Sequence, residues 1–135
     1  GITSNVGQGP RPDPAPALWD DAGVRRRLGQ LRAEYEIAEL LLQRAIWLHE
    51  QGHSDYRAQA AMVKLFNTEF AQRLYETSVE LMGLYGALME DSPRVPYDGA
   101  TAHNFLSAVQ DTIGAGTSEV QREIIALRGL GLPRG

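Results

Sequence analysis

Apolar residues recur at intervals of three and four along two long stretches of the chain, a spacing that predicts amphipathic α-helices. The first stretch begins at Asp20, which we expect to cap the helix, and ends near Gly52. The second begins after Ser54, another capping residue type, and ends before Pro93 and Pro96. The positions expected to face the core are Leu28, Leu31, Tyr35, Ala38, Leu42, Ala45 and Leu48 in the first helix and Ala58, Met62, Leu65, Phe66, Phe70, Leu74, Leu81 and Tyr85 in the second.

Two shorter helices are predicted after the prolines. One covers residues 100–112, and a hinge of glycine, alanine and glycine follows at 114–116. The other begins at Ser118 and ends at Gly129; the spacing of Ser118 and Gln121 is that of a capping box, in which each side chain satisfies the other's free backbone N–H. The apolar positions on or near one face of the helix at 100–112 are Phe105, Leu106, Val109 and Ile113.

No stretch shows the alternation of apolar and polar residues that marks a β-strand. We therefore expect an all-α fold, an up-and-down four-helix bundle formed by residues 20–135, with two long antiparallel helices and two shorter ones. Residues 1–19 contain four prolines and three glycines. This composition predicts an extended arm outside the bundle.

The chain has 135 residues, 13 of them Lys or Arg and 17 Asp or Glu, so its formal net charge is −4. This length fits one domain, and the acidic balance lacks the positive charge that attracts nucleic acid. No cysteine is present, which excludes disulfides and thiolate metal sites and is compatible with the cytoplasm, where we expect the protein to act. The apolar runs are far shorter than the roughly 18 residues that span a bilayer, so no membrane insertion is expected.

The sequence H-E-Q-G-H at residues 49–53 matches the H-E-x-x-H zinc motif. That motif needs both imidazoles on one continuous helix, whereas Gly52 stands where the helical pattern ends and Ser54 can begin the next helix. We therefore expect His53 to lie in a turn and no metal site to form. A zinc hydrolase that uses His49 and His53 stays an alternative, which metal analysis would test.

Other chemically active side chains have simpler structural explanations. His103 stands alone on its predicted helix, and we expect it to be a structural histidine. The three arginines at 25–27 are typical of a solvated helix face. Trp47 is expected to pack with Tyr35 and Phe66 in the core or at an interface.

The C-terminal segment is the most informative one. It reads G-A-G-T-S-E-V-Q-R-E-I-I-A at 114–126 and L-G-L-P-R at 130–134. A glycine turn here leads into a helix start, where free N–H groups and hydroxyls can bind an anionic or polar cofactor group. An ordinary capped helix explains the same residues equally well.

This segment resembles the end of the acyl-CoA dehydrogenase family, whose pattern is close to G-G-T-S-E-I-Q-R-x-I-I-A followed by L-G-L-P-R. Within 116–122 only Val120 differs, and conservatively. Two internal stretches are also similar, 60–65 to A-S-x-A-K-L and 79–86 to the segment that contains Q-x-x-G-G-x-G. The similarity extends over about residues 26–134.

The resemblance implies the C-terminal helical bundle of a larger flavoprotein that uses FAD to desaturate the Cα–Cβ bond of an acyl-CoA thioester. In the family the bundle follows a helical domain and a β-domain, for which this chain has no room, and we expect its first helix to be truncated. The family's R-x-x-F-G flavin-contacting segment has no counterpart, because the proline-rich arm occupies that region. The first residue is Gly1 rather than Met, so we expect an excised or processed chain.

The resemblance also implies cofactor-binding residues. Gly116, Thr117 and Glu119 match positions at the start of the last helix that contact FAD. Glu80 and Leu84 match positions that reach the FAD of a neighbouring subunit, although the family usually has Gln and Gly there. A carboxylate at position 80 would repel a pyrophosphate.

In many family members a Glu immediately before the Gly-Thr pair removes the substrate α-proton. Ala115 occupies that position, and a methyl group cannot accept a proton. We therefore assign no catalytic residue and expect this chain alone not to dehydrogenate an acyl-CoA. Either a bundle helix outside this chain carries the Glu, or the chain is a non-catalytic, flavin-contacting subunit of a hetero-oligomer.

A bundle that lacks a helix exposes an apolar groove, and such surfaces are usually covered by another chain. We therefore expect a homo- or hetero-oligomer, a dimer or a tetramer. The alternative of a different class is a helical interaction module that binds no cofactor. Saturable FAD binding would distinguish the two.

Overall fold

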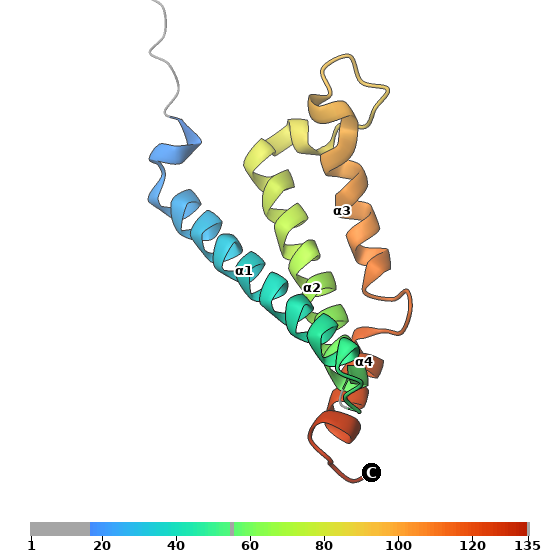
Figure 1. The fold of residues 1–135 in the computed structure, drawn as a ribbon. Helices are drawn as coiled ribbons and strands as arrows, with labels where there is room; N and C mark the ends of the chain where they lie inside the picture. The colour runs from blue at the N-terminus through green and yellow to red at the C-terminus, as the bar shows by residue number, and fades with distance from the viewer. Residues whose placement is uncertain (1–16, 55, 135) are drawn as a thin grey trace, which may run out of the picture.

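A computed structural model describes residues 17–54 and 56–134, and every regular element in this part of the chain is helical (Figure 1). The elements are η1 (Leu18–Asp20), α1 (Ala22–Glu50), α2 (Tyr56–Met82), η2 (Gly83–Ala87), η3 (Pro96–Gly99), α3 (Ala100–Asp111), α4 (Ser118–Ile124) and η4 (Ile125–Gly129). The predicted all-α class is confirmed. Most of the predicted arm at 1–19 lies outside the described residues.

The helices α1, α2 and α3 run alternately in opposite directions, as an up-and-down bundle requires (Figure 1). The helix that contacts all the others is α2, which packs against α1, α3 and the short α4. The predicted arrangement of two long and two shorter helices is thereby confirmed. No helix in the described part of the chain has both the length and the apolar character needed to cross a membrane.

The core consists mainly of small side chains. Leu31, Leu48 and Phe70 are its large members. The other buried apolar residues are Ala38, Ala45, Ala58, Ala61, Ala102 and Ala108. Because alanine side chains are short, the neighbouring helices can approach α2 closely along these positions.

Several residues predicted to face the core are instead exposed. Leu42 is 46 % exposed on α1, Leu106 is 58 % exposed on α3, and Ile113, just after α3, is 63 % exposed. Tyr35 and Val109 are also exposed. The alanines on these helices are buried, whereas the bulkier apolar positions beside them stay in solvent. Exposed apolar surface of this kind is typical of an interaction interface.

Asp21, rather than Asp20, caps α1. Its Oδ1 accepts hydrogen bonds from the backbone N–H groups of Gly23 (2.6 Å) and Val24 (3.0 Å). The hydrogen bonds from Val24 and Gly23 hold the pKa of Asp21 below its ordinary value. The prediction for Asp20 was wrong by one residue, because Asp20 belongs to the preceding 3₁₀ turn.

The second helix ends slightly earlier than its apolar pattern predicted. Gly83 has a left-handed φ of 57°, and the chain continues from there in the 3₁₀ turn η2. Tyr85, predicted on the buried face, therefore lies beyond α2 and is 54 % exposed. The role of Ser54 as a cap stays a prediction, because residue 55 lies outside the described residues.

Replacing Phe70 with alanine tests the core around α2. Phe70 is 8 % exposed, and such truncations of buried Phe reduce the free energy of unfolding by about 3–5 kcal/mol. Leu84→Ala is the control, because Leu84 is 90 % exposed and surface changes usually stay within about 0.5 kcal/mol. Urea unfolding, monitored by circular dichroism, measures the free energy of unfolding of both variants. Equal midpoints for the two variants would contradict the assignment of Phe70 to the core.

Candidate functional site

The loop between α3 and α4 and the first turn of α4 contain Gly116, Thr117 and Glu119, the residues that the family resemblance implies as FAD contacts. Ala115 and Gly116 are both left-handed, with φ values of 56° and 98°. This pair turns the chain so that Thr117 follows in an extended conformation and Glu119 lies in the first turn of α4. The sequence predicted a hinge here, and the structure has a turn of defined shape.

Thr117, rather than Ser118, caps α4. Thr117 Oγ1 accepts a hydrogen bond from the backbone N–H of Val120 at 3.4 Å. Gln121 does not complete a capping box; its Nε2 donates instead to the carbonyl oxygens of the two left-handed residues, Ala115 at 3.2 Å and Gly116 at 3.4 Å. The predicted capping box was therefore wrong, because the extended residue before the helix, which the cap must be, is Thr117.

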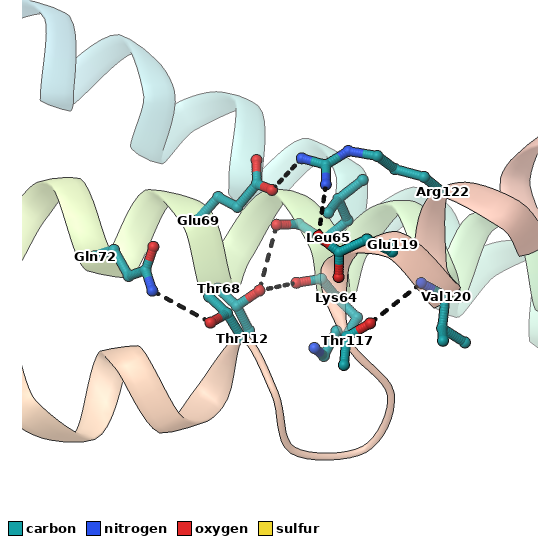
Figure 2. A network of polar contacts seen from close by, with 10 residues as sticks. All are labelled: Lys64, Leu65, Thr68, Glu69, Gln72, Thr112, Thr117, Glu119, Val120 and Arg122. Atoms are coloured by element: carbon teal, nitrogen blue, oxygen red, sulfur yellow. Dashed lines mark hydrogen bonds and ion pairs between the residues drawn. The ribbon is translucent and has the colours of Figure 1, made fainter.

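Side chains of α2 reach this loop and the helix that follows it (Figure 2). Lys64 Nζ donates a hydrogen bond to the carbonyl oxygen of Gly116 at 2.7 Å. Glu69 Oε1 accepts one from Arg122 of α4 at 2.5 Å. The sequence pattern identified neither contact, because each joins residues more than fifty positions apart.

Glu119 has an electrostatic environment that favours its charged form. Its pKa lies below the ordinary value because its own backbone N–H and the Thr117 side chain hydrogen-bond to the carboxylate, and Arg122 adds a weaker attraction. The distance between the Arg122 and Glu119 side chains is 3.9 Å, and the Glu119 side chain is 81 % exposed. Glu119 therefore offers a charged acceptor to an incoming group.

Ala115 lines a cavity of about 430 Å³. The cavity walls also include Arg57, Lys64, Gln121 and Arg128. No carboxylate is among the residues that line it in the described part of the chain. The described walls of this cavity therefore offer basic and amide groups.

Glu80 and Leu84 lie near the other end of α2, away from the loop. At the helical rise, the sixteen residues from Lys64 to Glu80 span about 24 Å. Glu80 forms an ion pair with Arg27 of α1 at 2.5 Å, and Leu84 is 90 % exposed on η2. The sequence missed Arg27, because the arginine run at 25–27 was interpreted as a solvated face and its partner is distant in the sequence.

His49 and His53 lie beside aromatic rings in the described part of the chain. The helix α1 ends at Glu50, and His53 lies in the turn that follows, as predicted. His49 packs against the ring of Tyr56, with centroids 4.5 Å apart, and His53 lies 5.9 Å from the ring of Trp47. Among the described residues, no group of three or more His, Cys, Asp or Glu is arranged to hold a metal ion.

The chain matches the model of the acyl-CoA dehydrogenase C-terminal domain over residues 11–130. It therefore belongs to the acyl-CoA dehydrogenase family and contains the C-terminal helical domain of such a protein. The match begins inside the proline-rich arm, earlier than the similarity at 26–134 indicated. Acyl-CoA dehydrogenases in general use FAD as their cofactor.

A curated relative and two solved structures agree with this assignment. The chain is 37 % identical over 119 residues to acyl-CoA dehydrogenase FadE29 of Mycobacterium tuberculosis (strain ATCC 25618 / H37Rv), covering 85 % of this chain and 29 % of that protein. It matches the ChsE4-ChsE5 complex from Mycobacterium tuberculosis with a TM-score of 0.77 and 33 % identity, and Tcur3481-Tcur3483 steroid ACAD with a TM-score of 0.81 and 27 % identity. Each structural match covers 87 % of this chain and 30 % of the other.

The pKa of Glu119 tests its hydrogen bond with the Thr117 side chain. Because the folded pKa lies below the ordinary 4.5, Glu119 stabilises the fold above pH 4.5, and this contribution is lost as the pH falls through the folded value. Thr117→Val removes one of its hydrogen bonds, and we expect the pKa of Glu119 to rise towards 4.5 in an NMR titration of its carboxyl carbon. Ser118→Ala is the control and should leave the titration unchanged. A rise with Ser118→Ala alone would contradict the hydrogen bond between Thr117 and Glu119.

Proposed function

We propose that this domain forms one wall of the FAD site in an acyl-CoA dehydrogenase assembly, which desaturates acyl-CoA thioesters at the Cα–Cβ bond. The observation that carries the proposal is the turn at 115–119. It places Gly116, Thr117 and Glu119, the residues at the family's FAD-contacting positions, beside one another. Its defined backbone shape is what a cofactor contact requires.

The groups present at this turn fit the polar part of a flavin. The oxygen of Thr117 accepts the capping hydrogen bond, and its O–H donates to the Glu119 carboxylate, which leaves one acceptor lone pair on the hydroxyl oxygen for an O–H or N–H group of the flavin. The exposed carboxylate of Glu119 accepts hydrogen bonds from hydroxyl or N–H groups. When bound, FAD supplies the oxidising chemistry, and the residues of this chain bind and orient it.

Glu80 and Leu84 belong, in this proposal, to the FAD site of a neighbouring subunit. Their separation from the turn along α2 supports this division. The ion pair with Arg27 offsets the negative charge of Glu80, which reduces the repulsion that an unpaired carboxylate would exert on a pyrophosphate. Arg27 thereby compensates for the departure from the usual Gln.

We further propose that this chain does not supply the base that removes the α-proton. Ala115 offers only a methyl group, and the described walls of the adjoining cavity contain no carboxylate. The base then comes from another part of the polypeptide or from a partner subunit. Both structural relatives carry the names of two proteins, the ChsE4-ChsE5 complex and Tcur3481-Tcur3483, and this supports a hetero-oligomer.

The exposed apolar positions of α1 and α3 provide the oligomer interface in this proposal. They also favour a second candidate function, a helical interaction module that binds no cofactor. FAD titration, followed by flavin fluorescence, separates the two. The protein is expressed from its whole reading frame with any co-purifying subunit. Saturable FAD binding supports the flavin site, and no binding supports the interaction module.

The 135-residue chain alone, supplied with FAD and an acyl-CoA, is expected to give no dehydrogenation, because it has no base at position 115. Reduction of an electron-accepting dye measures the activity. The control is a complete acyl-CoA dehydrogenase under the same conditions. Steady turnover by the isolated chain would contradict the proposed absence of a base.

A further inference from the structure

The turn at Ala115 and Gly116 has a left-handed backbone conformation, which is unfavourable for Ala115. Ala115 adopts a φ of 56°, and the left-handed region is unfavourable for an L-residue with a side chain because its Cβ approaches the following carbonyl oxygen. Gly116 at 98° carries no such penalty. The conformation therefore depends on contacts that outweigh the cost at Ala115.

Lys64 supplies one of these contacts from α2. Its ammonium group donates to the Gly116 carbonyl oxygen at 2.7 Å, a part-buried hydrogen bond between residues 52 positions apart. Hydrogen bonds with a charged donor are shorter and about twice as strong as neutral ones. Lys64 is the single lysine among the 13 basic residues of the chain, and its compact ammonium group on a flexible stem suits a lone carbonyl oxygen.

Gln121 supplies a contact from α4. It is 6 % exposed, and its Nε2 donates to the carbonyl oxygens of Ala115 and Gly116. A Cβ on Gly116 would lie 2.7 Å from this nitrogen. The carbonyl oxygen of Gly116 is thus shared by Lys64 and Gln121, and its orientation is fixed from two helices.

The earlier end of the loop is also attached to α2. Gln72 Nε2 donates to Thr112 Oγ1 at 3.2 Å, and Figure 2 shows this bond on the same side of α2 as Lys64. The Thr112 hydroxyl itself donates to the carbonyl oxygen of Val109 at 2.8 Å. Both ends of the loop are therefore tied to one rigid helix.

We infer that Lys64 is a positioning residue for the FAD site: through the Gly116 carbonyl, and together with Gln121, it fixes the left-handed turn that places Thr117 and its hydrogen-bond partner Glu119 at the flavin. This inference rests on the proposed function. Lys64 acts through the loop and does not itself contact the cofactor. Its removal should therefore weaken FAD binding only as far as Thr117 is misplaced.

The first test compares Lys64→Met with Arg44→Met in the protein expressed from its whole reading frame. Lys64→Met keeps most of the apolar stem and removes the charged donor, and we expect about tenfold weaker FAD binding, the scale of one hydrogen bond to a charged group. Arg44 is exposed on α1 and does not line the cavity at Ala115, so Arg44→Met should change FAD affinity by less than about twofold. Equal affinities for wild type and Lys64→Met would overturn the inference.

A double-mutant cycle with Thr117→Val distinguishes positioning from a general loss of stability. If Lys64 acts through Thr117, Lys64→Met should have little further effect on FAD affinity once the Thr117 hydroxyl is gone. Independent, additive effects of the two substitutions would overturn the positioning role. Thermal unfolding without FAD checks that each variant is folded.

A second variant, Gln121→Leu, removes the other donor to Gly116 and serves if Lys64→Met does not fold. It should weaken FAD binding in the wild-type background and have little further effect when combined with Thr117→Val. Additive effects of Gln121→Leu and Thr117→Val would overturn the inference.

The outcomes also separate the positioning role of Lys64 from the proposed FAD site. An effect of Thr117→Val without an effect of Lys64→Met leaves the FAD site standing and rejects the positioning role. No FAD binding by the wild type rejects both.

Discussion

The packing of α2 against every other helix is the constraint on which the rest of the structure depends. α1, α3 and α4 all contact it, and the alanines buried between the helices keep these contacts close. The polar contacts follow the same plan. Lys64, Glu69 and Gln72 reach from its first two thirds to the loop and α4, whereas Glu80 in its last turn meets α1. The helix α2 therefore sets the position of both groups of residues that the family resemblance implies as FAD contacts, the turn at 116–119 and the pair Glu80 and Leu84.

The sequence predicted the helices well because their periodicity is a local property. It also located the chain reversal at 51–54 and the turn at 114–116 from glycine positions. It failed at the caps by one residue, at Asp21 and at Thr117, because neighbouring residues of the same chemical type compete and only the backbone conformation decides between them. Periodicity also could not indicate which apolar positions of a helix face pack against another helix. Leu42, for example, lies on the predicted apolar face of α1 but is exposed.

The contacts that shape the candidate site were beyond any local pattern. Lys64 and Gly116 are 52 residues apart, and Arg27 and Glu80 are just as distant along the chain. The family resemblance identified the loop residues, but it could not indicate which side chains fix their geometry. It also treated Glu80 as unfavourable for a pyrophosphate, whereas the structure pairs this carboxylate with Arg27.

The central claim is that the turn at 115–119 contacts a flavin although Ala115 cannot act as a base. Amide hydrogen exchange of the protein from its whole reading frame, with and without FAD, tests this claim most directly. The account predicts slower exchange with FAD at residues 115–121, together with slower exchange at 80–86 where a neighbouring subunit is bound. FAD binding that leaves exchange at 115–121 unchanged would contradict it.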